Sequence, residues 1–262
     1  EPPCWTSSKD KCGKYENNDK VPSRMPNGDD LYRRAQKTKE ESAAGSDGWK
    51  PKELKALPRN AWRHRAGVLQ LASELKRYPK DYYDVTTVAL PKRDKGTQPL
   101  DRRLLAIFSS LYRIEAGARY DIIKPWLRDI LHPNVLGAIE GTEALDIAWD
   151  AQAFLENALL KNESLGLVSY DFKKFFDSFE HSFTKEMLIH AGVPEDLAEL
   201  TYHLYTNMSR VIRKGTALSQ PFTAFNGFGQ GDIISLLPAL IIVSWQFKML
   251  DEVHPGSTKG AY

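Results

Sequence analysis

One carboxylate, Asp171, stands where an apolar run meets a segment rich in lysine and phenylalanine. Residues 165–170 carry no charge and are typical of a short buried strand. A carboxylate at the end of such a strand is costly unless a partner compensates its charge, and a divalent metal ion is one such partner. An Asp in this position also commonly caps the turn that follows. Asp171 is therefore either a metal ligand or a turn cap.

The residues that follow Asp171 favour the metal ligand. Residues 169–177 read Ser-Tyr-Asp-Phe-Lys-Lys-Phe-Phe-Asp. This string resembles the first metal-binding motif of reverse transcriptases, especially those of non-LTR retrotransposons and group II introns. The resemblance implies that Asp171 bridges two Mg²⁺ ions and that the backbone carbonyl of Phe172 completes their coordination. It also implies that the Phe176 ring excludes a ribose 2′-hydroxyl, although Phe176 could instead be a core residue.

A glycine-rich segment, residues 227–235, carries a second motif. It reads Gly-Phe-Gly-Gln-Gly-Asp-Ile-Ile-Ser and is similar to the Gly-x-x-Gln-Gly-Asp-x-x-Ser element of the same family. The resemblance places Gly229 and Gly231 near the template or primer, because glycine lets a backbone approach closely. It places Gln230 within hydrogen-bonding reach of the nascent base pair. A glycine-rich turn that simply starts a helix would explain the glycines but not Gln-Gly-Asp.

Two cations belong to segments that resemble the fingers of these polymerases. Lys92 ends a Leu-Pro-Lys tripeptide, and Arg103 precedes an apolar, Ser-containing segment that ends Leu-Tyr-Arg-Ile. The resemblance implies that both contact the triphosphate of the incoming nucleotide, a role that suits the planar fork of Arg and the point charge of Lys. The alternative is a pair of solvated charges on a hairpin. The family pattern fails at Glu140, where a positive charge is expected.

The motif that supplies the remaining metal carboxylates, Tyr/Phe-x-Asp-Asp, does not occur in the sequence. We therefore expect a fragment of a reverse-transcriptase-like polymerase, inactive alone, whose full-length parent uses Mg²⁺, dNTP and an RNA or DNA template–primer. The alternative is a catalytically inactive scaffold or binding subunit, derived from a reverse transcriptase, with protein partners in a larger complex.

These segments require an α+β fold. The resemblance implies right-hand polymerase fingers at 42–137 and an incomplete palm at 138–262, after a polar N-terminal extension at 1–41. Hydrophobic periodicity and turn residues predict the other elements. The predicted strands are 85–90, 165–170, 209–213 and 220–225, and the predicted helices include 62–77, 111–131, 143–160, 181–191, 195–205 and 233–250. The apolar stripe of helix 143–160 is expected to face the core.

Charge is distributed unevenly along the chain. Residues 1–137 hold 27 Lys and Arg against 18 Asp and Glu, a net charge of +9, whereas residues 138–262 hold 9 against 16, a net charge of −7. Such a division suits one lobe that binds phosphates and another that binds metal ions. It equally suits two lobes that attract each other.

Other classes of site find little support. Cys4 and Cys12 are too few for a zinc site made of cysteines, although they could form one local disulfide. No apolar run is long enough to span a membrane. Neither feature decides the cellular compartment.

Packing gives one more expectation. Without the missing strands, residues 165–170 would present an unpaired edge and helix 233–250 would lose a packing surface. Exposed edges and apolar patches recruit other chains. We therefore expect another chain, residues 1–41 or residues beyond Tyr262 to cover both.

Overall fold

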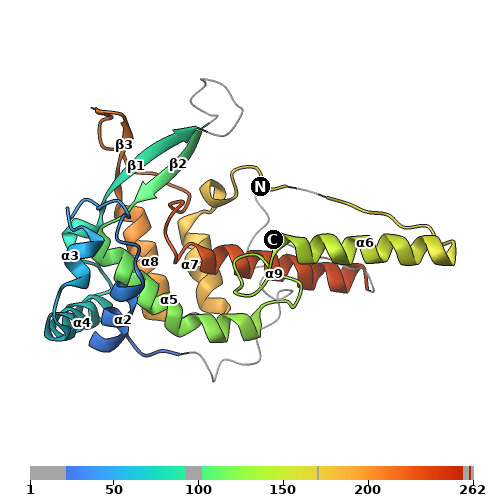
Figure 1. The fold of residues 1–262 in the computed structure, drawn as a ribbon, viewed down its shortest axis with the longest axis horizontal. Helices are drawn as coiled ribbons and strands as arrows, with labels where there is room; N and C mark the ends of the chain where they lie inside the picture. The colour runs from blue at the N-terminus through green and yellow to red at the C-terminus, as the bar shows by residue number, and fades with distance from the viewer. Residues whose placement is uncertain (1–21, 92–101, 170, 256–259, 261–262) are drawn as a thin grey trace.

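The computed structural model describes residues 22–91, 102–169, 171–255 and 260. The described part is an α+β fold of eight α-helices and one mixed four-stranded sheet (Figure 1). This confirms the predicted α+β class, whereas the arrangement into polymerase fingers and an incomplete palm stays a prediction.

Three helices precede the sheet: α2 (Gly28–Lys37), α3 (Pro51–Lys55) and α4 (Arg59–Glu74). A capping box fixes the start of α2, because the Asn27 side chain accepts from the Asp30 amide and the Asp30 side chain accepts from the Asn27 amide, each at 3.0 Å. The last turn of α2 carries Arg34 and Lys37, as the helix dipole favours. A short 3₁₀ helix, η2 (Lys80–Tyr82), leads into the sheet.

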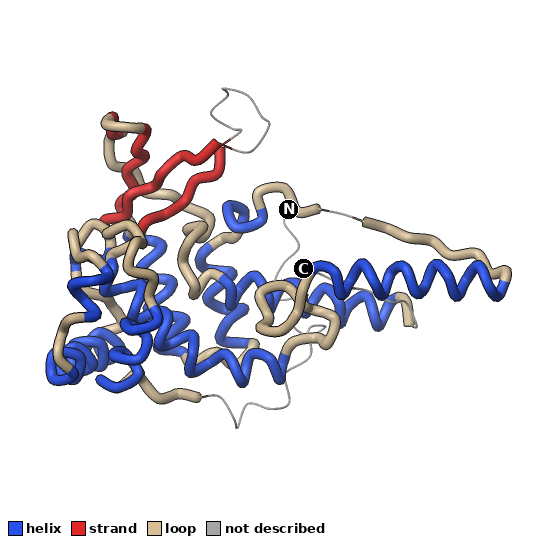
Figure 2. Tube along the Cα trace, in the orientation of Figure 1, coloured by secondary structure: helices blue, strands red, loops and turns tan. Residues whose placement is uncertain are grey.

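The sheet has the order β2-β1-β3-β4, with strands β1 (Asp84–Pro91), β2 (Arg102–Ile107), β3 (Ser209–Lys214) and β4 (Ala217–Leu218). Strand β1 pairs antiparallel with β2 and parallel with β3, which lies more than 100 residues away in the sequence. Figure 2 shows these strands grouped at one corner of the molecule. The predictions for 85–90 and 209–213 are confirmed.

The predicted strand 220–225 is wrong. The chain turns at Gly215, whose φ is +63°. The strand that pairs with β3 after this turn is β4, which precedes residues 220–225. Within 220–225, Phe222 makes an isolated bridge to Arg210. The hairpin closes early because glycine tolerates this left-handed turn.

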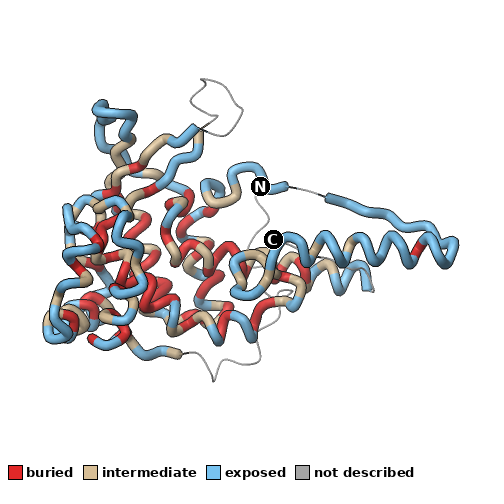
Figure 3. The backbone as a smooth tube through the Cα atoms, in the orientation of Figure 1, coloured by how far each residue is buried: buried red, intermediate tan, exposed pale blue. Residues whose placement is uncertain are grey.

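The core is built mainly from α5 (Ser110–Ile130), α7 (His181–His190), α8 (Glu195–Asn207) and α9 (Leu236–Val253). Figure 3 shows buried positions along all four helices. Leu237, Leu240, Ile241 and Trp245 of α9 are all buried. The expectation that this helix lacks a packing surface is therefore wrong, because the chain itself covers its apolar side.

Helix α6 (Ala144–Lys161) confirms the predicted helix but not its burial. Phe154 is 43% exposed and Leu155 is 38% exposed, whereas Ala158 is buried. Figure 1 shows α6 far from α2, α3 and α4 along the longest axis of the molecule. Helical periodicity predicts that a helix has an apolar face, but it does not predict whether another element covers that face.

The predicted strand at 165–170 is also wrong. Residues 165–169 form no strand and are exposed, including Leu167 at 70% and Val168 at 83%. Residue 170 lies outside the described part. A strand needs a hydrogen-bonded neighbour, and none of the described strands pairs with this segment.

No helix among the described residues is long and apolar enough to span a membrane.

Candidate functional site

The Gln-Gly-Asp loop, residues 227–235, connects two distant parts of the chain through its backbone. The Ala106 amide of β2 donates to the Gln230 carbonyl at 2.8 Å. On the other side, the Phe228 amide donates to the Phe176 carbonyl at 2.8 Å, at the 3₁₀ helix η4 (Phe175–Ser178). The loop therefore joins the sheet to the segment that follows Asp171.

Close packing explains the glycines of this loop. Gly231 has a φ of +117°, and a Cβ there would lie 2.8 Å from the Ala106 carbonyl oxygen. A Cβ at Gly229 would lie 2.8 Å from the Phe108 ring. Gly229 is buried, whereas Gly231 is exposed and Gln230 is half-buried. Contacts within the chain thus account for both glycines, and the predicted approach to a template or primer stays a prediction.

Asp232 anchors the loop to the core. Its Oδ2 accepts from the hydroxyls of Tyr112 at 2.9 Å and Tyr205 at 2.7 Å, and its Oδ1 accepts from the Ile234 amide at 3.2 Å. Burial raises the pKa of this carboxyl, and the hydrogen bonds oppose that shift. The sequence did not reveal this role of Asp232, because Tyr112 and Tyr205 belong to other helices and only the fold brings their hydroxyls to the carboxylate.

Phe176 lies at one end of a cluster of aromatic rings centred on Phe175. The Phe175 ring lies 5.6 Å from Phe176 and 5.0 Å from the buried Phe179, between ring centroids. Phe172 is 43% exposed and stacks 4.9 Å from Phe175. Phe176 is half-buried, so the residue retains accessible surface. Its backbone carbonyl accepts the hydrogen bond from the Phe228 amide of the Gln-Gly-Asp loop. Its position is compatible with both the steric gate and the core role.

Arg103 is exposed on β2, opposite Leu90 of β1. Lys92 lies outside the described residues. Alternation along paired strands places Arg103 on the same face of the sheet as Val88, and Val88 is opposite Arg213 of β3. Arg213 is also exposed. Sequence reasoning missed Arg213 because only the parallel pairing of β1 with β3 brings it to this face.

Asp171 is exposed in a segment without regular structure. Among the residues that the structure describes, no three His, Cys, Asp or Glu side chains gather closely enough to hold a metal ion. The predicted metal role of Asp171 stays a prediction.

No known protein-family model matches the sequence, and no curated protein matches it significantly. The functional interpretation depends on the motif residues and their geometry.

Proposed function

We propose that this chain supplies the fingers and part of the palm of a reverse-transcriptase-like polymerase and binds the incoming nucleotide and the template–primer there. The observation that carries this proposal is the docking of the Gln-Gly-Asp loop between β2 and η4. Three segments that resemble polymerase motifs, distant in the sequence, thereby become neighbours.

The sheet face beside this loop suits a triphosphate. Leu105 forms the bridge to Gln230, and Arg103 lies two residues farther along β2, which corresponds to about 7 Å. Arg213 adds a second exposed guanidinium on the same face. Guanidinium groups bind phosphate oxygens through charge-assisted hydrogen bonds. The pair could therefore hold phosphate groups while the loop approaches the base.

Catalysis belongs to the full-length parent in this proposal. Mg²⁺ would assist phosphoryl transfer there, with Asp171 as one oxygen ligand and further carboxylates from outside the described residues. The 262-residue chain alone would bind nucleotide without polymerising it.

The test measures the affinity of a fluorescent dNTP for the 262-residue chain by anisotropy. Arg103→Ala and Arg213→Ala should each weaken binding at least about tenfold, since a hydrogen bond to a charged group contributes about 1.5–3 kcal/mol. Arg128→Ala removes an equal charge from an exposed position of α5 and should leave the affinity unchanged. Equal affinities of the Arg103→Ala and Arg128→Ala variants would contradict the nucleotide site.

A second candidate function rests on exposed apolar surface. Leu159 and Leu160 at the end of α6 are 80% and 88% exposed, and Val168 is 83% exposed. Exposed apolar surface of this kind marks interaction sites. It favours an inactive scaffold or binding subunit, with a protein partner in a larger complex. Primer extension by the full-length parent separates the two functions: activity supports the polymerase, and inactivity with retained partner binding supports the scaffold.

A further inference from the structure

Helix α4 carries apolar residues on two of its faces. The residues that it buries against the rest of the chain are Trp62, Leu69 and Ala72. On another face, Val68 is 41% exposed and Leu71 is 52% exposed, and Leu75 at the C-cap is also 52% exposed. A helix that packs against one core needs only one apolar face. The second face of α4 is therefore available to a partner.

The exposed residues have the spacing of a contact between two helices. They are His64, Val68, Leu71 and Leu75, and we call them the α4 seam. Successive members of the seam are four, three and four residues apart, which is the spacing of the a and d positions through which paired helices pack. The backbone of Leu75 is still helical, with φ of −81° and ψ of −6°, so the seam extends to this residue.

Gly67 is a second, independent observation that points to a close partner. It lies in the interior of α4, where glycine is less stable than alanine. A Cβ at Gly67 would meet no described atom within 4 Å. Contacts within the described chain therefore do not require glycine at this position. A glycine beside an apolar seam lets a second helix approach more closely, because the distance between packed helices depends on the side chains at the contact.

The α4 seam is complementary to a second copy of itself. Its four members are placed symmetrically about the point between residues 69 and 70. In an antiparallel pair with a two-fold axis at that point, Val68 faces Leu71 of the second copy, and His64 faces Leu75 of the second copy. Such a two-fold contact is closed, because each pair of facing residues occurs twice.

Charge favours the antiparallel orientation. Arg63 and Glu74 are exposed near opposite ends of the seam, and neither forms an ion pair within the described part of the chain. Their hydrogen bonds stay within α4: Arg63 donates to Asn60 at 3.3 Å, and Glu74 accepts from Gln70 at 3.2 Å. An antiparallel pair brings each Arg63 near Glu74 of the second copy, whereas a parallel pair brings like charges together.

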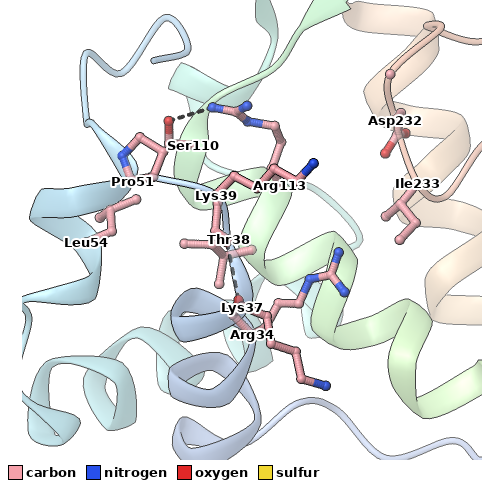
Figure 4. A pocket seen from close by; sticks show the side chains of 12 residues that line it. Arg34, Lys37, Thr38, Lys39, Pro51, Leu54, Ser110, Arg113, Asp232 and Ile233 are labelled. Carbon is pink, nitrogen blue, oxygen red and sulfur yellow. Dashed lines mark hydrogen bonds between the residues drawn. The ribbon is translucent and has the colours of Figure 1, made fainter. Parts of the chain in front are cut away.

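This surface is separate from the nucleotide site proposed above. Helix α4 lies at the opposite end of the molecule from α6 (Figure 1). None of its residues lines the cavity of about 300 Å³ between α2, α3, α5 and residues 231–233 (Figure 4). We propose that the α4 seam is the interface of a symmetric, antiparallel homodimer of this chain. The dimer does not depend on the proposed polymerase function.

Sedimentation equilibrium of the 262-residue chain over a concentration series tests the proposal. The dimer should dissociate in the micromolar range, because one helix from each copy makes a smaller contact than a standard stable interface. Val68→Ser/Leu71→Ser should weaken the dimer at least about 100-fold, since both copies lose two apolar side chains from the centre of the contact. The matched control is Leu159→Ser/Leu160→Ser on α6, which removes two exposed leucines and should leave the dimer unchanged.

Gly67→Trp distinguishes loss of the dimer from loss of folding. Thermal stability at concentrations where the chain is monomeric should not fall, because the space around a Gly67 side chain is open and tryptophan has a better helix propensity than glycine. The dimer should weaken at least about tenfold, because a large side chain at the contact holds the two helices farther apart.

Charge exchange tests the orientation. Arg63→Glu and Glu74→Arg should each weaken the dimer about tenfold, since each turns two attractive contacts into repulsive ones, and the double variant should restore the affinity. Equal affinities of the wild type and both single variants would overturn the antiparallel arrangement. A chain that stays monomeric throughout the concentration series would overturn the proposal. A dimer that the α6 control dissociates and the α4 variants do not would overturn it as well.

Discussion

At the residue scale, buried polar contacts in this chain hold the motif loop in place. The Asp232 carboxylate accepts three hydrogen bonds. The Tyr205 hydroxyl, one of the three donors, also accepts a hydrogen bond from the Gly229 amide at 3.3 Å. Removing one partner of a buried carboxylate leaves polar atoms without compensation. The loop geometry should therefore depend on the tyrosine hydroxyls as much as on its own glycines.

Tyr205→Phe should lower the free energy of unfolding by about 2 kcal/mol, because it removes a hydroxyl that serves both Asp232 and Gly229. Urea denaturation followed by circular dichroism measures the change. Tyr202→Phe on the same helix is the control, since Tyr202 is only half-buried and should change stability by less than about 0.5 kcal/mol. Equal losses in both variants would contradict the anchoring role of the Tyr205 hydroxyl.

Phe176→Ala in the full-length parent should allow incorporation of ribonucleotides while leaving dNTP incorporation largely intact. In the proposed polymerase, the Phe176 ring would otherwise clash with a 2′-hydroxyl. Primer extension with dNTP and rNTP measures the ratio of kcat/KM values, and Phe175→Ala tests whether general loss of aromatic packing has the same effect. An unchanged ratio in Phe176→Ala would assign Phe176 to the core alone.

At the element scale, two helices that were both expected to carry an apolar packing face have opposite environments. Helix α9 is buried by the chain, whereas α6 exposes most of its apolar face. An apolar stripe does not by itself guarantee burial, because burial depends on which other elements lie against it. The loop 227–235 likewise acquires its shape from β2 and η4 on either side.

Leu159→Ser and Leu160→Ser should each change the free energy of unfolding by less than about 0.5 kcal/mol, because both side chains are largely solvated. Leu197→Ala, at a site that is 1% exposed, should cost about 2–5 kcal/mol in the same denaturation assay. A large loss from Leu159→Ser would show that α6 packs against other parts of the chain.

Gly231→Ala should destabilise the chain by about 1–3 kcal/mol, because alanine is strained at positive φ and its Cβ would approach the Ala106 carbonyl. Gly166→Ala is the control, since a Cβ there meets no atom within 4 Å. Thermal or urea unfolding measures both variants. If Gly231→Ala is as stable as Gly166→Ala, the loop does not pack on β2 as described.

At the scale of the whole molecule, the chain combines a basic first half with an acidic second half, of net charge +9 and −7. The cations of the basic half lie on different surfaces. Arg103 lies on the outer face of the sheet, and Arg34 and Arg113 line the cavity between α2, α3 and α5. The described acidic residues do not assemble into a metal site.

The 262-residue chain alone should extend no primer on an RNA or DNA template with Mg²⁺ or Mn²⁺. The reason is that no three His, Cys, Asp or Glu side chains gather into a metal site among the described residues, and one carboxylate does not hold two metal ions tightly. A gel-based primer-extension assay measures this, with the full-length parent as the positive control. Template-dependent, dideoxy-sensitive incorporation that Asp171→Ala abolishes would contradict the prediction.

Local patterns in the sequence predicted most of the elements. Periodicity and turn residues correctly predicted α5, α6, α7, α8, β1 and β3, because helix and strand patterns depend on neighbouring residues. The tertiary structure decided which apolar faces are covered, that residues 165–169 form no strand, and that Arg213 joins the face of Arg103. It also decided that Asp232 is bound by Tyr112 and Tyr205. These features depend on contacts between distant segments, and a residue pattern does not specify the partner that completes a sheet, a core or a buried hydrogen bond.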